Sequence, residues 1–141
     1  KYVEYFENGQ KHIEEHLKLG KRNGLMTKWH ENGQKEFKAN YKNGKSDGLM
    51  TKWYENGQKE SEINSKNGEV VDGVVTEWHD NGQKASEGNW KNGEVVDGVV
   101  TIWNKEGDVT ETETYKDGKL VSSNNRLFKN IVDKILDELE N

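Results

Sequence analysis

Apolar and polar residues alternate over short stretches of the chain, and the same stretches recur along it. One of them, residues 25–30, has the sequence LMTKWH. Successive side chains of an extended strand point to opposite faces, so Leu25, Thr27 and Trp29 are expected on one face. Residues 35–41 show the same alternation on the return path. This period of two residues predicts short β-strands.

Asn-Gly pairs separate these stretches at regular intervals. The triplet Asn-Gly-Gln recurs with spacings of 24, 24 and 25 residues, beginning at Asn8, Asn32, Asn56 and Asn81. A second glycine follows twelve residues after each of these asparagines, at Gly20, Gly44, Gly68 and Gly93. Asn-Gly favours tight hairpin turns because both residues accept positive φ angles. Each unit is therefore expected to form a hairpin of two antiparallel strands.

Five such units predict a mainly β fold, an elongated antiparallel meander of about ten strands. The expected units are residues 1–23, 24–47, 48–72, 73–97 and 98–122. Trp103 continues the aromatic series into the fifth unit, where Glu106-Gly107-Asp108 replaces Asn-Gly-Gln. A repeat array of this kind stacks each unit only against its neighbours.

The last stretch, residues 123–141, changes its period and predicts an amphipathic capping helix. Ser123 or Asn124 is a plausible N-cap. Apolar residues then follow at helical spacing, at Leu127, Phe128, Ile131, Val132, Ile135, Leu136 and Leu139. Ile102 occupies the position that Lys28 holds in the second unit, so the helix is expected to cover residues 100–102.

The composition supports a thin fold and excludes several classes of protein. Only 30% of the residues are hydrophobic, 33% are charged and the mean hydropathy is -1.17, which leaves little material for a round core. Five Trp and five Tyr nevertheless argue against disorder. Cysteine is absent, and no apolar run approaches the roughly 20 residues of a membrane-spanning helix.

The charge is spread unevenly along the chain. The net charge is -5, yet residues 1–60 carry 12 basic and 9 acidic side chains, against 9 and 17 in residues 61–141. A chain with this net negative charge is a poor candidate for binding nucleic acid through phosphate contacts. The same charge argues against binding to anionic membranes.

Two short motifs resemble catalytic signatures, and neither fits the repeat. Residues 12–16 match the H-x-x-E-H pattern of a metalloprotease class, which needs a helix. In a strand His12 and His16 would stand roughly 13 Å apart and could not share an ion. Residues 39–46 match a relaxed phosphate-binding loop, but a strand follows where a helix is required. We expect no enzyme activity, no metal and no cofactor.

Aromatic residues fall into rows. The first row, expected to fill the fold as a structural ladder, comprises Tyr5, Trp29, Trp53, Trp78 and Trp103. A neighbouring row varies between units, as residues of a repeat-protein binding surface do. Its His30, Tyr54 and His79 are the predicted partner contacts, together with Tyr41 and Trp90 from a third row.

The unit G-x-x-T-x-W-[HY]-[ED]-N-G-Q-K, followed by an aromatic residue and K-N-G, resembles the bacterial variant of the MORN repeat over residues 2–119. The resemblance implies stacked β-hairpins in an elongated, twisted sheet with a groove. It also implies binding to proteins or membrane surfaces rather than catalysis. Some members of that family are described as antitoxins, and others are exported.

The expected function is therefore a non-catalytic repeat scaffold that binds a protein partner through a sheet surface. Three alternatives stay open: an antitoxin or immunity protein, a secreted or cell-envelope adhesion protein, and a membrane-surface binder. The expected compartment is the bacterial cytoplasm, or the envelope or exterior if a signal sequence preceded Lys1.

Overall fold

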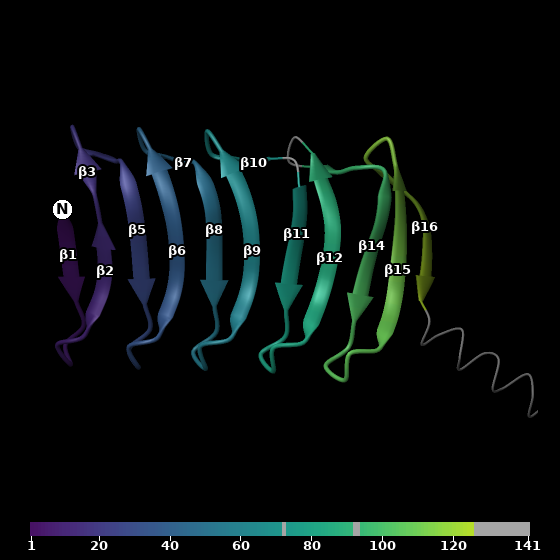
Figure 1. Ribbon diagram of the computed structural model, residues 1–141, viewed down its shortest axis with the longest axis horizontal. Helices are drawn as coiled ribbons and strands as arrows, with labels where there is room; N and C mark the ends of the chain where they lie inside the picture. The colour runs from purple at the N-terminus through teal and green to yellow at the C-terminus, as the bar shows by residue number, and fades with distance from the viewer. Residues whose placement is uncertain (72, 92–93, 126–141) are drawn as a thin grey trace, which may run out of the picture.

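A computed structural model describes residues 1–71, 73–91 and 94–125, and most of their strands stand side by side in one long antiparallel sheet (Figure 1). The strands are β1 (Tyr2–Tyr5), β2 (Lys11–Glu15), β3 (Leu17–Lys18), β4 (Lys21–Arg22), β5 (Gly24–Trp29), β6 (Lys35–Lys42), β7 (Lys45–Ser46), β8 (Gly48–Trp53), β9 (Lys59–Lys66), β10 (Glu69–Val70), β11 (Gly73–Trp78), β12 (Lys84–Lys91), β13 (Glu94–Val95), β14 (Gly98–Trp103), β15 (Val109–Lys116) and β16 (Lys119–Asn125).

The strand order confirms the predicted antiparallel meander of hairpins. Along the sheet it runs β1-β2-β5-β6-β8-β9-β11-β12-β14-β15-β16, so each long strand lies beside the next long strand of the chain. The short strands β7, β10 and β13 pair with the ends of β6, β9 and β12, while β3 and β4 form a ladder of their own. The described residues contain no helix.

Pairing is extensive within a hairpin and brief between hairpins. Strands β5 and β6 share six residue pairs, from Gly24↔Tyr41 to Trp29↔Lys35. Strands β6 and β8, which join two units, share only Phe37↔Lys52 and Lys38↔Thr51. The register shifts just before the aromatic residue of every unit, as between Lys28 and Trp29, and such a bulge re-aims the side chain that follows it.

The two Asn-Gly turns of a unit differ in conformation. At Asn43-Gly44 both residues have positive φ, 52° and 86°, as a two-residue hairpin turn requires. At Asn32-Gly33 only the glycine does, with φ 83°, and His30 N donates to Gln34 O at 2.9 Å. The expectation that both turn residues adopt positive φ is therefore wrong at this turn. It is a three-residue loop that needs a left-handed residue only at its last position.

The sheet has two faces, and neither is covered by a second layer among the described residues. We call the face that carries Leu25, Trp29, Lys35 and their equivalents the Lys–Trp face. The opposite one, the Met–Ala face, carries the directly paired Met26 and Ala39 and their equivalents. Met26 (7% exposed) and Ala39 (0%) are the buried hydrophobic residues of the described part, so the fold depends on rows along the sheet rather than on a core.

The predicted start of the C-terminal helix is wrong. Strand β16 continues to Asn125 and pairs with β15, with Ser123 opposite Glu113 and Asn124 opposite Thr112. The open edge of β15 presents backbone groups that need partners, and continued pairing satisfies them better than a local helix cap. The rest of the predicted helix, including its expected packing on residues 100–102, lies outside the described residues.

Candidate binding surfaces

The asparagine of each Asn-Gly-Gln triplet fastens one unit to the next. Asn32 Oδ1 accepts from Gln34 N at 2.9 Å, and Asn32 Nδ2 donates to Glu55 O in the following turn at 2.6 Å. The same donation to the next unit is made by Asn8, Asn56 and Asn81. These asparagines form a line of bonds along one edge of the array, which explains their place in the motif.

Replacing Asn56 with alanine should therefore weaken the array at one junction. The change removes the bond to Gln58 N and the bond to Asp80 O. Both groups are exposed and can bind water instead, so we expect a loss of about 1 kcal/mol and a melting temperature lower by roughly 3–5 °C. Thermal unfolding followed by circular dichroism measures it. Asn64→Ala, at an exposed position of β9, should change little; equal losses in the two variants would contradict this role.

The variable row of rings also bonds to neighbouring units. The Tyr54 hydroxyl donates to Trp78 O at 2.8 Å. His30 Nε2 lies 3.0 Å from Trp53 O, and His79 Nε2 lies 2.9 Å from Trp103 O. Since a carbonyl only accepts, each histidine carries its proton on Nε2. Burial raises the pKa of Tyr54. The three residues predicted to contact a partner are therefore half-buried, and their polar atoms already hydrogen-bond backbone carbonyls of the same chain.

The five predicted contacts do not gather at one place. Tyr54 and His79 line a groove of about 370 Å³, shared with Lys52, Glu60, Ser61, Glu77, Trp78 and Ala85. Tyr41 lies at the far end of its strand, where the Arg22 guanidinium stands 5.4 Å from the ring centroid. Trp90, also half-buried, is opposite Gly73 and Val95. A partner touching all five would have to span both ends of the strands.

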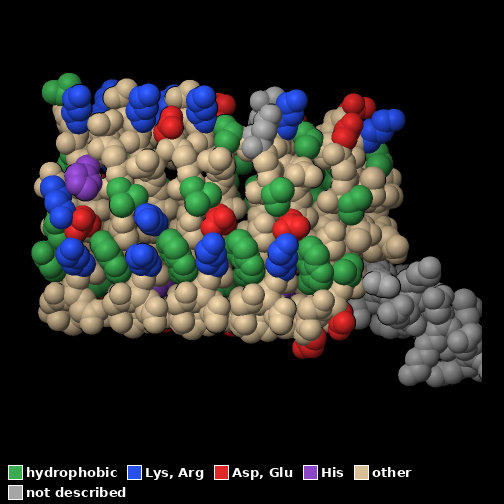
Figure 2. Space-filling view, viewed as in Figure 1, with side chains coloured by type: hydrophobic (Ala, Val, Ile, Leu, Met, Phe, Trp, Pro, Cys, Tyr) green, Lys and Arg blue, Asp and Glu red, His purple; other side chains and the backbone are tan. Residues whose placement is uncertain are grey.

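On the other face, lysines alternate with the aromatic ladder (Figure 2). Each lysine that follows a Gln places its ammonium 5.5–5.9 Å from the ring centroid of the next unit's tryptophan, in the pairs Lys11–Trp29, Lys35–Trp53, Lys59–Trp78 and Lys84–Trp103. Cation–π attraction therefore stabilises each junction between units. Sequence reasoning found the tryptophans and missed the lysines, although their fixed position in the motif was visible.

Two further rows complete the Lys–Trp face. An aliphatic row is exposed to solvent: Leu25 (41%), Leu49 (53%), Val74 (55%) and Val99 (52%). A row of charged residues, mostly acidic, lies between it and the tryptophans (Figure 2). Its members are Glu14, Lys38, Glu62 and Glu87, which the register places opposite Val3, Thr27, Thr51 and Thr76.

The acidic members of that row are bound by lysines. Lys59 Nζ lies 2.7 Å from Glu62, and Lys84 Nζ lies 2.5 Å from Glu87. Hydrogen bonds from Lys11 and Lys1 lower the pKa of Glu14 to about 2. Because these ion pairs are exposed, they contribute little to folding stability. Their main effect is to neutralise charge on the Lys–Trp face.

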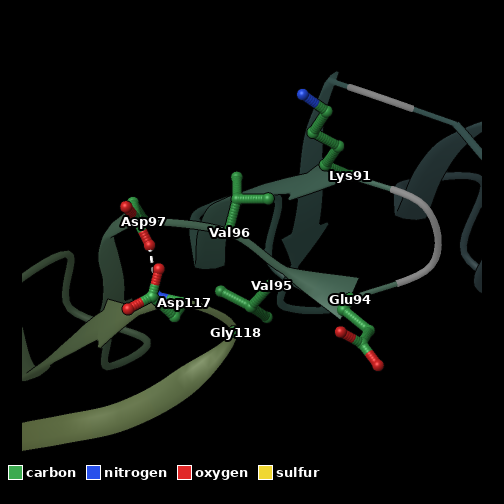
Figure 3. A pocket seen from close by; sticks show the side chains of 7 residues that line it. All are labelled: Lys91, Glu94, Val95, Val96, Asp97, Asp117 and Gly118. Carbon is green, nitrogen blue, oxygen red and sulfur yellow. Dashed lines mark hydrogen bonds between the residues drawn. The ribbon is translucent and has the colours of Figure 1, made fainter.

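A separate cavity of about 520 Å³ lies at the loop between β13 and β14 (Figure 3). Asp97 Oδ1 accepts from Asp117 N at 2.5 Å, and Glu94 points away from this pair (Figure 3). The carboxylates do not converge on a common point. We therefore assign no binding role to this cavity.

The two motifs that resemble catalytic signatures lie in strands and turns of the repeat. His12 belongs to β2 and bonds Glu4 at 2.8 Å, whereas His16 bonds Leu25 O at 3.1 Å. Residues 39–46 form the end of β6, a turn and β7. In the part of the chain that the structure describes, no three His, Cys, Asp or Glu side chains are grouped so as to hold a metal ion. None of its segments is a helix of the length and hydrophobicity needed to cross a bilayer.

Comparison with known proteins agrees with this architecture. The sequence pattern of the MORN repeat variant family matches residues 22–43, 46–67 and 71–92. The first two matches end at Asn43 and Asn67, the first residues of Asn-Gly turns. The comparison with curated proteins found no match. The chain belongs to the family of MORN-variant repeat proteins.

Proposed function

We propose that this repeat scaffold is non-catalytic and binds a protein partner on the open Lys–Trp face of its sheet. The observation that supports the proposal is the aliphatic row, four aligned side chains that are each 41–55% exposed. Exposed apolar residues scattered singly are ordinary, but an aligned set beside an aromatic row is typical of an interaction site. The tryptophans alongside supply large side chains of the kind that anchor interfaces.

The Met–Ala face is the competing surface, because it carries Tyr41, Tyr54 and Trp90. We favour the Lys–Trp face since its aliphatic side chains are exposed within the described part of the chain, whereas Tyr54 and its equivalents already bond to the next unit. The prediction that those residues touch a partner remains open to the same experiment.

A capture experiment with face-specific variants separates the two surfaces. The bait is the full chain in extract of its source organism, analysed by quantitative mass spectrometry. Replacing Leu49 and Val74 with lysine should abolish capture of a stoichiometric partner, because it places two charges in the apolar row. The triple variant Tyr54→Ala, His79→Ala and Trp90→Ala tests the other face. Capture that survives the first change and is lost with the second would move the interface to the Met–Ala face.

A further inference from the structure

The row of acidic residues on the Lys–Trp face changes sign at one unit. In three units a lysine bonds a glutamate three residues further on, as Lys11 bonds Glu14 at 2.7 Å. In the second unit Lys35 has Lys38 at that place instead. Within residues 1–71, 73–91 and 94–125, no carboxylate lies within ion-pair distance of either lysine. Two cations on one strand are thus left without the neutralising partner that other units have.

These two lysines border a groove of about 590 Å³ over the junction of β6 and β8. Its walls also include the exposed Leu25 and Leu49 and the ring of Trp53. The Lys59–Glu62 ion pair lies on the same wall, so three lysines face one glutamate there. At the equivalent junction of β9 and β11, Glu62 of β9 stands in the place of Lys38, and both it and Glu87 of β12 are paired with a lysine. The groove at β6 therefore combines an apolar wall with an excess of positive charge.

We propose that this groove binds an acidic and aliphatic segment of a protein partner. Its carboxylates would lie between Lys35 and Lys38, and an aliphatic side chain would pack against Leu25 and Leu49. Charge complementarity selects this occupant: residues 1–60 carry three more basic than acidic side chains, although the whole chain is acidic. The inference rests on the proposed function and adds the chemistry of the partner.

A designed peptide tests the chemistry without knowledge of the partner. The probe is a fluorescein-labelled octapeptide of alternating leucine and glutamate, and its counterpart has glutamine in place of glutamate. Fluorescence polarisation with the full chain should show binding of the glutamate peptide that weakens as salt rises, and weaker binding of the glutamine peptide. Equal binding of the two peptides would overturn the proposal.

The repeat itself supplies a variant that is safe for folding. Lys38→Glu restores the residue found in three other units and should form the bond to Lys35 that those units show. It should weaken binding of the glutamate peptide about tenfold. Glu62→Lys transfers the lysine pair to the third unit and should strengthen binding or add a second site. Lys116→Glu makes the same charge change far from the groove, opposite Lys119, and should have little effect.

The outcomes distinguish this inference from the proposed function. If a captured partner binds wild type and Lys38→Glu equally, the groove assignment is wrong while the scaffold function stands. A 12-nucleotide single-stranded DNA or anionic lipid vesicles serve as competing probes. Tighter, Lys38-dependent binding of either one would also overturn the assignment to an acidic peptide. Lys38→Gln, which removes the charge alone, repeats the test if Lys38→Glu disturbs the fold.

Discussion

Substituting aspartate for Ala39 is expected to destabilise the array by about 3–5 kcal/mol. Ala39 is 0% exposed, and the register places Met26 directly opposite. A carboxylate there would lose its hydration without gaining a cation. Ile63 and Gly88 hold the equivalent position in the next two units, so the central units leave this row uncharged. Urea unfolding of the full chain, followed by tryptophan fluorescence, measures the loss.

The neighbouring residue provides the control. Lys38 is exposed on the opposite face, so Lys38→Asp should change the free energy of unfolding by less than about 0.5 kcal/mol. The end units show what an acidic residue needs at the Ala39 position. Glu15 there is bound by Arg22, and Glu113 accepts from the Tyr115 hydroxyl. If Ala39→Asp and Lys38→Asp unfold at the same urea concentration, the assignment of the two faces is wrong.

The hairpin frame could be predicted from the sequence because its causes are local. Period-two alternation and Asn-Gly turns are set by residues that are adjacent in the chain, and both signals recur in successive units. The conformation of the Asn32-Gly33 loop and the continuation of β16 to Asn125 could not be predicted in this way. Each of these two features depends on which backbone N–H and C=O groups of a neighbouring strand are free to form hydrogen bonds.

The same limit applies to the candidate site. The rows of aromatic residues are visible in the sequence, but the bond from Tyr54 to Trp78 O joins residues 24 positions apart and exists only through the register of the units. The lysine at position 38 is visible as a departure from the repeat. Its meaning depends on Lys35 and Trp53 lying on the same face, which a bulge before each tryptophan brings about.

Removing the ring of Trp53 should have the second large effect, a loss of about 2–4 kcal/mol. Trp53 is half-buried in the central unit, paired in register with Lys59 and stacked beneath the Lys35 ammonium of the preceding unit. Trp53→Ala therefore removes packing within one hairpin and the cation–π contact between two hairpins. Urea unfolding measures the total loss, and amide hydrogen exchange should show faster opening in β6, β8 and β9 than in β14 and β15.

Tyr5→Ala is the matched control, because Tyr5 holds the equivalent position in the first unit and is 58% exposed. Its removal should cost less than about 1 kcal/mol and affect β1 and β2 alone. The Trp53 ring is contacted by a lysine of the preceding unit, whereas no lysine of the described residues stands over the Tyr5 ring. Equal losses of stability in the two variants would mean that the lysine–tryptophan contacts do not set the stability of the junctions. Uniform acceleration of exchange after Trp53→Ala would mean that the sheet unfolds as a single unit.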